Sequence, residues 1–512
     1  MVFIAATAGA VTCVAFFLPC VHLLQLCKYR PSAVFCTDFY FGLYLSAVVR
    51  AAVCVLVLLL FESLNLPLLA SASVYVVFLA SFLWQKKEKA KKPLVFTPRV
   101  KRLIALFFCI SFAAAVLPYY AFGLKEGGFL AAIAAETALY PVFLASAAAI
   151  LYPFELLNNN RKIRIAAQLL KEKNMIKIGI TGSFGKTSVK EILYTVLSRK
   201  YKVLRTEGNF NTPAGISLTL EKMRGDEAVF IAEMGARKTG DIAFLARMVK
   251  PDYGIITGVA PQHLETFGTF EAVRKTKGEL AAALPDYGTL IVNADEEQAD
   301  ISGAVCNVVQ VGKNGKYRVK DVRTDKNGSS FVFCTESEEE VFETVLLGRH
   351  NVQNIALAAA LACELGLKPA DIAKAVKSVK APPHRLELTV TPDLTIIDDS
   401  YNANPSGVKC ALEVLSEFDG IKTVITPGMV ELGDEEETLN REYGKLIAEV
   451  ADKVVLIGKY PAEYVYNGLS AAGYKGAVYR FPTLSEAEQS FGRVLSRGET
   501  VLFANDLPDN YK

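Results

Sequence analysis

The first 155 residues of this 512-residue chain carry five apolar runs, which constrain the fold more than any other feature. A helix needs about 20 mainly apolar residues to cross the ~30 Å hydrocarbon core of a bilayer. The runs reach that length or nearly so, at Val2–Leu26, Phe39–Phe61, Leu66–Trp84, Leu103–Phe122 and Gly128–Tyr152. The first run has no basic segment before it and is too long for a signal peptide. We therefore expect a membrane domain of about five transmembrane helices over residues 1–155.

The charge of the loops between these runs alternates with each crossing. The loops after the second and fourth runs are nearly neutral. The loops after the first, third and fifth runs are basic, with Lys28 and Arg30, the segment Gln85–Arg102, and the group Arg161, Lys162 and Arg164. Because Lys and Arg accumulate on the cytoplasmic side, this pattern predicts a multi-pass protein of the cytoplasmic membrane. Its N-terminus would lie outside, and everything after the fifth run would lie in the cytoplasm.

Three charged residues, Asp38, Arg50 and Glu136, fall inside or at the rims of the runs. Charges at this depth are functional candidates, but helix packing or snorkelling to the interface also explains them. The basic segment Lys86–Lys92 is expected either to contact anionic lipid headgroups or to be a solvated cytoplasmic loop. Membrane lipids are therefore expected partners.

Charge and cysteine content exclude other classes of function. The net charge is only +3, which gives no reason to expect a nucleic-acid partner. Six of the ten cysteines lie in the apolar part. The other four, Cys306, Cys334, Cys363 and Cys410, are far apart and form no CxxC pair, so neither a zinc site nor a disulfide framework is expected.

The segment Gly179–Glu191, GITGSFGKTSVKE, joins a short buried strand, Met175–Gly182, to a helix with apolar periodicity, Lys186–Ser198. In such a glycine-rich turn, backbone N–H groups and the helix N-terminus point at phosphate oxygens. Lys186 can reach the β- and γ-phosphates, and the Thr187 hydroxyl can bind Mg²⁺. The turn is shorter than the usual GxxxxGK loop. The predicted phosphate-binding residues are Gly182, Ser183, Gly185, Lys186, Thr187 and Ser188.

Six segments, in order, resemble the Mur ligase family, and in particular its branch that adds D-alanyl-D-alanine. They are TGSFGKTS (181–188), TEGNFNTPAGISLTL (206–220), IAEMGARKTGDI (231–242), APQHLETFGTFEAVRKTKGEL (260–280), LLGRHNVQNIALAAALA (346–362) and IDDSYNANPSGVKCALEVL (397–415). The resemblance implies a central α/β P-loop ATPase domain over residues 156–383 and a Rossmann-like α/β C-terminal domain over residues 384–512. It also implies an ATP-dependent ligase of peptidoglycan precursor synthesis that joins a carboxylate to an amine, with ATP and Mg²⁺ as cofactors.

The expected catalytic set consists of Lys186, Glu233, His263 and Lys277. Forming an amide through an acyl phosphate brings a carboxylate up to a polyphosphate, so negative charge must be neutralised, and hard oxygen ligands suit Mg²⁺. Thr187 and Glu233, which ends the strand AVFIAE, can hold one ion at the carboxyl edge of a parallel sheet. By resemblance, His263 binds a second Mg²⁺, together with Lys277 if that lysine is carbamylated. The alternative for Lys277 is an unmodified surface lysine.

The resemblance divides the remaining site residues into two groups. Residues expected at the nucleotide are Asn293, Asn351, Asn354, Arg385 and Asp399. Residues expected at the substrates are Asn209, Asn211, Thr212, Tyr401, Asn402 and Asn404. Because Arg385 and the residues after it follow a linker with two prolines, we expect domain closure, which would exclude water from an acyl phosphate.

The sequence departs from the family pattern at three places. Only Pro153–Lys177 separates the last apolar run from the phosphate loop, so the family's UDP-binding N-terminal domain is not recognised. Gly428, in TPGMVELG, stands where the branch usually has an acidic residue. The chain ends VLFANDLPDNYK, where the branch usually has a basic segment.

These departures leave the substrates open. The expected acceptor is a UDP-linked or lipid-linked muramoyl peptide, and the expected donor is an amino acid or a dipeptide such as D-alanyl-D-alanine. The main alternative is a Mur-like ligase that amidates, or adds another amino acid to, a lipid-linked cell-wall precursor. An ATP-driven transporter component is disfavoured because no LSGGQ-type signature is present. An inactive scaffold is disfavoured because Lys186, Glu233 and His263 are all retained.

Overall fold

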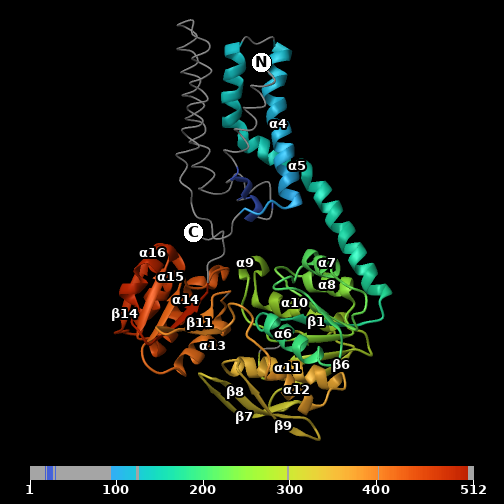
Figure 1. Cartoon of the computed structure of the whole chain (residues 1–512), viewed down its shortest axis with the longest axis vertical. Coiled ribbons are helices and arrows are strands. Elements are labelled where there is room, and N and C mark those ends of the chain that lie inside the picture. Colours follow the sequence, from blue (N-terminus) through green and yellow to red (C-terminus); the bar gives the residue numbers. More distant parts are fainter. Residues whose placement is uncertain are drawn as a thin grey trace. The chain divides into compact units, whose positions relative to one another are not determined.

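The structure is a computed structural model that describes residues 18, 20–22, 24–26, 29, 94–122, 126–296, 299–401 and 403–505. The second and third predicted apolar runs, with Asp38 and Arg50, lie outside the described residues. Glu136 lies in a helix, but its side chain is not described. The chain divides into two compact units, one ending at Asn160 and the other covering Arg161–Leu507 (Figure 1).

The first unit contains two long helices, α4 (Pro98–Phe122) and most of α5 (Glu126–Glu172). Thr97 accepts a hydrogen bond from the Val100 N–H, and Pro98 takes the first helical position, which explains why α4 begins before the predicted run. The two helices pack through buried side chains that include Leu103, Phe107 and Leu144. A salt bridge of 2.7 Å joins Arg102 of α4 to the buried Glu155 of α5.

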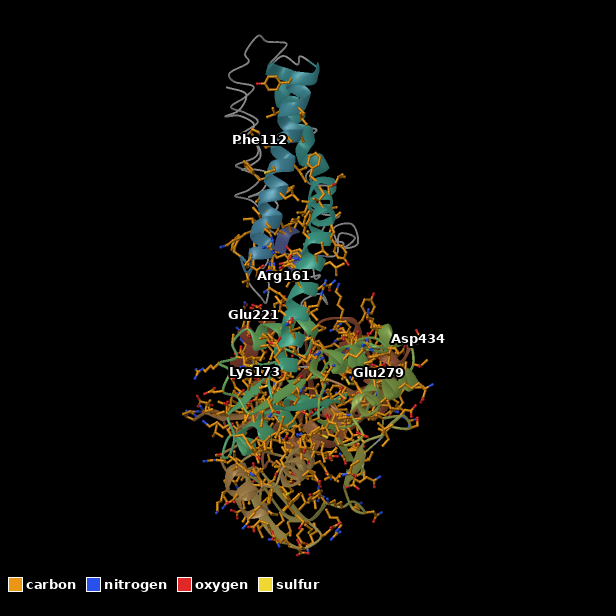
Figure 2. All side chains as sticks on the ribbon, turned by 90° about the vertical axis from the view of Figure 1, so that its right-hand side faces the viewer. Phe112, Arg161, Lys173, Glu221, Glu279 and Asp434 are labelled. Carbon is orange, nitrogen blue, oxygen red and sulfur yellow. The ribbon has the colours of Figure 1, made fainter. Side chains whose placement is uncertain are left out.

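Helix α5 is longer than the sequence predicted. The fifth apolar run was expected to end at Tyr152, but the helix continues through the expected connecting segment to Glu172. The reason lies in the pattern after Arg161, where Ile163, Ala166, Ala167 and Leu170 recur at helical spacing and pack into the core of the second unit. Figure 2 marks Arg161 and Lys173, which bracket this amphipathic part.

The apolar part of the chain is only partly covered by the description. Among the described residues, one helical stretch, Val142–Glu172, is long and apolar enough to cross a membrane, judged by length and composition alone. The core helix of a soluble protein can pass the same test, so this stretch does not by itself establish the predicted five-helix bundle.

The second unit contains two α/β domains, each built on its own six-stranded sheet (Figure 1). In the first domain the strands are all parallel, in the order β2-β3-β1-β4-β5-β6. They are β1 (Ile176–Thr181), β2 (Val203–Arg205), β3 (Val229–Glu233), β4 (Tyr253–Ile256), β5 (Thr289–Asn293) and β6 (Asn307–Val311). The predicted strand before the phosphate loop and the strand that ends at Glu233 are confirmed.

Helices cover both faces of this sheet. They are α6 (Lys186–Leu197), α7 (Pro213–Leu220), α8 (Asp241–Val249), α9 (Leu264–Phe267), α10 (Phe270–Ala283), α11 (Arg349–Glu364) and α12 (Pro369–Val376). One face packs on α6, α11 and α12, and the other packs on α7, α8, α10 and the end of α5. A separate three-stranded antiparallel sheet, which the sequence did not predict, consists of β7 (Arg318–Asp325), β8 (Gly328–Cys334) and β9 (Glu339–Thr344).

The second domain has strand order β10-β11-β15-β12-β13-β14, with only β10 antiparallel to its neighbour. Its strands are β10 (Glu387–Val390), β11 (Leu394–Asp399), β12 (Lys422–Thr426), β13 (Lys453–Ile457), β14 (Ala477–Phe481) and β15 (Glu499–Ala504). Its helices are α13 (Pro405–Ser416), the 3₁₀ turn η2 (Gly433–Glu435), α14 (Glu436–Val450), α15 (Tyr460–Ala471) and α16 (Leu484–Val494). This parallel arrangement bears out the predicted Rossmann-like C-terminal domain.

Helices α14 and α15 touch backbone to backbone because a glycine on each permits it. A Cβ atom at Gly468 would lie 2.0 Å from the Arg441 carbonyl oxygen, and one at Gly444 would lie 2.2 Å from the Val465 carbonyl oxygen. Since both obstacles are backbone atoms, no side-chain rotation can relieve the overlap.

Replacing Gly468 by alanine is therefore expected to destabilise the C-terminal domain by about 1–3 kcal/mol, because the helices must separate. Gly492 of α16 is the matched control, since a Cβ there meets no atom within 4 Å. Gly492→Ala should be neutral or stabilising by up to about 1 kcal/mol. Urea unfolding followed in both variants checks this, and equal stability of the two would contradict the backbone contact.

Candidate functional site

The phosphate loop lies between β1 and α6, where the sheet order reverses. Strand β1 is flanked by β3 and β4, and such a switch point in a parallel sheet opens a crevice at the carboxyl ends of the strands. Gly182 and Gly185 have φ angles of 148° and 75°. A Cβ at Gly182 would lie 2.0 Å from Thr257 Oγ1, and one at Gly185 would lie 2.5 Å from Asn354 Oδ1. Only glycine fits both positions, as the predicted loop requires.

Ser183 fixes the loop against the neighbouring strand end. Its N–H donates to the Gly258 carbonyl at 2.8 Å, and its hydroxyl donates to the Ala260 carbonyl at 3.0 Å. The side chain is buried. The hydroxyl of Ser183 is thus engaged in shaping the loop. Ser188 follows in the first turn of α6.

Lys186 opens α6 and lies over the loop. Its Nζ atom donates to the carbonyl oxygens of Gly182 at 2.7 Å and Ser183 at 3.2 Å. Burial lowers the pKa of Lys186 to about 8, against the opposing effect of the Glu233 carboxylate. A cation held at the mouth of a turn of backbone N–H groups can neutralise a polyphosphate.

Glu233, at the end of β3, is the centre of the predicted metal site. One carboxylate oxygen accepts hydrogen bonds from Thr187 Oγ1 at 3.0 Å and from Lys190 Nζ at 3.1 Å. The other accepts from Asn211 Nδ2 at 3.1 Å. The side chains of Glu233 and Thr187 thus place two hard oxygen atoms side by side next to the phosphate loop. This donor set fits Mg²⁺.

His263, which the resemblance predicts to bind a second Mg²⁺, lies after β4 at the start of α9. It caps α9 in a left-handed conformation, with φ 54°, and its Nδ1 contacts the carboxylate of Glu431. Arg237 makes a second ion pair with Glu431, at 3.2 Å. Burial lowers the pKa of His263, and the hydrogen bond from His263 lowers the pKa of Glu431. Glu431 belongs to the C-terminal domain, so this group joins the two α/β domains.

Lys277 is buried in α10, with a side chain that is 2% exposed, so it is not the surface lysine considered as the alternative. Burial lowers its pKa well below the usual value, and the charge of Lys186 lowers it further. Among the described residues, its amino group makes no hydrogen bond or ion pair. Both effects favour the neutral amine, which is the form that reacts with CO₂ to give a carbamate, so the environment fits the predicted modification. Within the same described ranges, no hydrogen bond links Lys277 with His263.

Two of the asparagines predicted to contact the nucleotide, Asn351 and Asn354, lie in α11 next to the phosphate loop. Asn354 donates to Asn351 Oδ1 at 3.2 Å, and Asn351 donates to the Leu347 carbonyl at 3.0 Å. The carbonyl oxygen of the Asn354 side chain is also the atom that faces Gly185. Asn293 ends β5 and is buried, where it accepts a hydrogen bond from the Asp295 N–H at 3.1 Å.

The interdomain linker carries Arg385 towards the site. The guanidinium of Arg385 lies 4.0 Å from the centre of the Tyr401 ring, and the Tyr401 hydroxyl accepts a hydrogen bond from Asn209. Burial raises the pKa of Asp399 to about 7, opposed by the charge of Arg385. Predicted residues from both domains, Asn209, Tyr401, Arg385 and Asp399, are therefore brought together.

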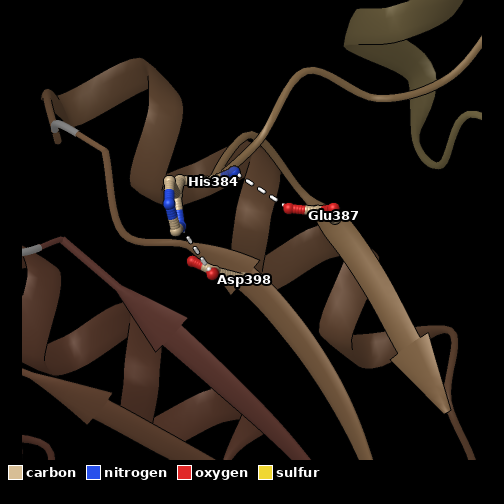
Figure 3. A group of neighbouring side chains, drawn as sticks. All are labelled: His384, Glu387 and Asp398. Carbon is tan, nitrogen blue, oxygen red and sulfur yellow. Dashed lines mark hydrogen bonds and ion pairs between the residues drawn. The ribbon is translucent and has the colours of Figure 1, made fainter.

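The linker itself is pinned by a cluster of three side chains, His384, Glu387 and Asp398 (Figure 3). His384 Nδ1 lies 2.8 Å from Asp398, and the His384 N–H donates to Glu387 at 3.2 Å. Ser400 donates a further hydrogen bond to Asp398. Because these groups satisfy one another, the cluster is explained by the need to hold the backbone on either side of Arg385.

Three of the predicted substrate residues are not part of this group, because two cap helices and one is not described. Thr212 accepts a hydrogen bond from the Gly215 N–H and caps α7, and Asn404 accepts one from the Gly407 N–H and caps α13. Their side-chain oxygens are thus engaged in holding helix ends. Asn402 lies outside the described residues.

Gly428 is the position where the sequence lacks the acidic residue that the branch usually has. It has φ 86°, and a Cβ there would lie 2.8 Å from Asn440 and Pro461, so no side chain fits.

Comparison with known proteins agrees with this geometry. A model described as the Mur ligase middle domain matches residues 180–362, and one described as the Mur ligase, glutamate ligase domain matches residues 384–505. This chain belongs to the Mur ligase family. Members of the family are ATP-dependent amide ligases that use Mg²⁺.

Relatives within the Mur ligase family include UDP-N-acetylmuramoyl-tripeptide–D-alanyl-D-alanine ligases. The Bacillus subtilis enzyme is 32% identical over 66% of this chain and 75% of its own length. The Haemophilus influenzae enzyme is 34% identical over 55% of this chain and 63% of its own, so the chain spans less than two thirds of that relative.

Solved structures give the same result. MurF from Acinetobacter baumannii superposes with a TM-score of 0.63 at 27% identity and covers 68% of this chain and 77% of its own. MurF from Thermotoga maritima, in complex with ADP, superposes with a TM-score of 0.60 at 27% identity, over 69% and 81% of the two chains.

Sequence reasoning missed three residues that the structure places in the site. Lys190 and Glu431 contact Glu233 and His263 directly, and His384 holds the linker. Lys190 could have been found, because it lies three and four residues after Thr187 and Lys186, on the same face of the helix. Nothing in the sequence signals that Glu431 meets His263, since 168 positions separate them.

Lys186→Ala is expected to lower ATP-dependent turnover by at least about 100-fold, because the polyphosphate loses its countercharge in a partly dry site. Phosphate release during turnover measures the effect. Lys200→Ala is the control. Lys200 is exposed in the turn after α6, so this variant should keep full activity. Retention of more than a tenth of the activity by Lys186→Ala would contradict the role of this lysine.

Proposed function

We propose that this protein is a membrane-anchored ligase of peptidoglycan precursor synthesis that joins D-alanyl-D-alanine to a muramoyl tripeptide. The observation that carries the proposal is the grouping of Lys186, Thr187 and Glu233 at the phosphate loop, in a chain whose relatives carry the name of that reaction. The loop supplies ATP binding, and the residues from the second domain supply the acceptor side of the site.

The proposed reaction has two steps. A carboxylate oxygen of the peptide attacks the γ-phosphorus of ATP, the bond to the β-phosphate oxygen breaks, and an acyl phosphate and ADP result. The amine of the dipeptide then attacks the acyl carbon, phosphate leaves with the electrons of the C–O bond, and the amine loses a proton. Mg²⁺ held by Thr187 and Glu233 supplies charge neutralisation at the phosphates.

The chain's own residues provide the remaining requirements. Lys186 holds positive charge at the transferred phosphate, and Arg385 can approach the nucleotide from the linker. The contacts of Asn209 with Tyr401 and of His263 with Glu431 hold the two α/β domains together. A closed arrangement of this kind excludes water, which would otherwise hydrolyse the acyl phosphate.

The membrane part of the proposal comprises residues 1–155, with the ligase domains at 156–383 and 384–512 on the cytoplasmic side. It is supported by the loop charges and by α5, because only 22% of the 18-residue apolar window within its described stretch, Val142–Glu172, is buried. Exposed apolar side chains on the two helices of the first unit include Leu117, Tyr120, Val142, Ile150, Tyr152, Phe154 and Leu157.

Because these side chains would face lipid, the protein should stay in the membrane pellet when membranes are washed at alkaline pH, and it should be released only by detergent.

A product assay tests the reaction. Detergent-solubilised protein is incubated with ATP, Mg²⁺ and D-alanyl-D-alanine, and UDP-linked and lipid-linked tripeptides are offered separately. We expect the UDP-linked tripeptide to gain the dipeptide, as read by mass. A product with the lipid-linked tripeptide alone would move the acceptor to the membrane. No dipeptide product with either acceptor, while another amine is accepted, would favour a ligase with a different amine donor.

Lys277→Ala is expected to lower turnover by about 100-fold or more, and added short carboxylates should restore part of it. The reason is that a carbamate on Lys277 would hold a second Mg²⁺, and a small carboxylate can take its place. Lys275→Ala is the matched control, because Lys275 lies two positions away on the exposed face of α10. Full activity of Lys277→Arg would rule out the carbamate, since a guanidinium cannot form one.

A further inference from the structure

Lys190 is a buried cation that the ligase reaction, as described so far, does not use. Its side chain is 0% exposed and lies in the second turn of α6. Its Nζ atom contacts three acceptors, namely Glu233 Oε2 at 3.1 Å, Glu191 Oε1 at 3.6 Å and the carbonyl oxygen of Gly208. Glu233 ends β3, Glu191 lies in α6 and Gly208 lies in the loop after β2, so the three acceptors belong to different segments.

The Gly208 carbonyl belongs to a short segment, Glu207–Asn211, called here the 207–211 loop. Asn209 of this loop donates to the Tyr401 hydroxyl, and Asn211 donates to the carboxylate of Glu233. The loop has no place in a strand or helix, and Gly208 has φ 47°. At its end the Gly235 N–H donates to the Asn211 carbonyl at 2.8 Å, and at its centre the contact that holds it to α6 is the one from Lys190 to the Gly208 carbonyl.

The surroundings of Lys190 are nearly neutral in charge. Glu233 and Glu191 balance Lys190 and Arg205, which makes an ion pair with Glu191 at 2.9 Å. Arg205 in turn lies 3.6 Å from the centre of the Tyr194 ring. Replacing a buried ion pair by apolar side chains is often neutral or stabilising, so stability alone gives little reason for a lysine here. A role in positioning the 207–211 loop explains the buried Lys190 better.

We propose that Lys190 is a positioning residue that fixes the 207–211 loop to the phosphate-loop helix and so presents Asn209 and Asn211 to the peptide acceptor. The single ammonium group aligns the end of β3, the helix α6 and the loop. Lys190 contacts neither the phosphate-loop amides nor Lys186. Its contact with the nucleotide side is through Glu233, which keeps its hydrogen bonds from Thr187 and Asn211 when Lys190 is lost. Loss of Lys190 therefore acts mainly on the acceptor side of the reaction.

The first test measures the loop without any substrate. Amide hydrogen exchange is compared in full-length, detergent-solubilised protein carrying Lys190→Met or Lys190→Gln. We expect amides of residues 207–211 to exchange at least about tenfold faster in both variants. Lys190→Arg, which keeps the charge, should stay within about threefold of the parent protein.

Lys453→Met is the matched control. Lys453 pairs with Glu499, whose side chain is 1% exposed, and also donates to the Val494 carbonyl at 3.1 Å. The pair thus has the same makeup as Lys190 with Glu233 but lies in the C-terminal sheet. Lys453→Met should leave the exchange of residues 207–211 unchanged, which separates loss of the anchor from a general loss of stability.

The second test is kinetic and rests on the ligase reaction proposed above. With UDP-linked tripeptide as acceptor, Lys190→Met should raise the acceptor KM at least about tenfold while the KM for ATP stays within about threefold. Lys190→Arg should restore most of the acceptor KM. Absence of ligation in the parent protein would refute the proposed reaction, whereas the exchange experiment would still decide the anchoring role of Lys190.

Three results would overturn the positioning role. One is unchanged exchange of residues 207–211 in the neutral variants. Another is faster exchange with unaltered acceptor KM and kcat. The third is failure of both neutral variants to fold while Lys453→Met folds, because Lys190 would then serve the fold itself.

Discussion

The carboxylate of Glu233 is almost completely buried at the end of β3, and the arrangement of the site depends on keeping it charged there. A buried carboxylate without partners would carry a desolvation penalty of several kcal/mol. Three donors offset this penalty, the hydroxyl of Thr187, the ammonium of Lys190 and the amide of Asn211. Two of the donors, Thr187 and Lys190, come from α6 and the third comes from the loop after β2, so satisfying one charge aligns the phosphate-loop helix with that loop.

The parallel sheet explains why these segments meet. With β1 between β3 and β4, the carboxyl ends of these neighbouring strands open at the same edge, although the residues that follow them are up to about 80 positions apart in the chain. The phosphate loop, Glu233 and His263 all follow strands of this central group. The second domain reaches the same edge through Arg385 and Tyr401, which a pinned linker holds in place.

The sequence predicts those parts of the site that depend on local pattern. The strand, turn and helix around Lys186 and the end of the strand at Glu233 are where periodicity and glycine spacing put them. Thr212 and Asn404 show the limit, because the same short polar side chains serve as substrate ligands and as helix caps. The pairing of His263 with Glu431 depends on how two domains meet, which no local pattern encodes.

Helix α5 shows how one element can satisfy two environments. Its 47 residues correspond to about 70 Å at 1.5 Å per residue, more than twice the ~30 Å hydrocarbon thickness of a bilayer. Apolar residues occur on all sides up to Leu157, three asparagines and two basic residues follow, and an amphipathic pattern then packs on the α/β core. Under the membrane proposal, the polar segment Asn158–Lys162 marks the water boundary, because it is where the all-round apolar pattern changes to a one-sided one. The two compact units divide inside this same segment, between Asn160 and Arg161.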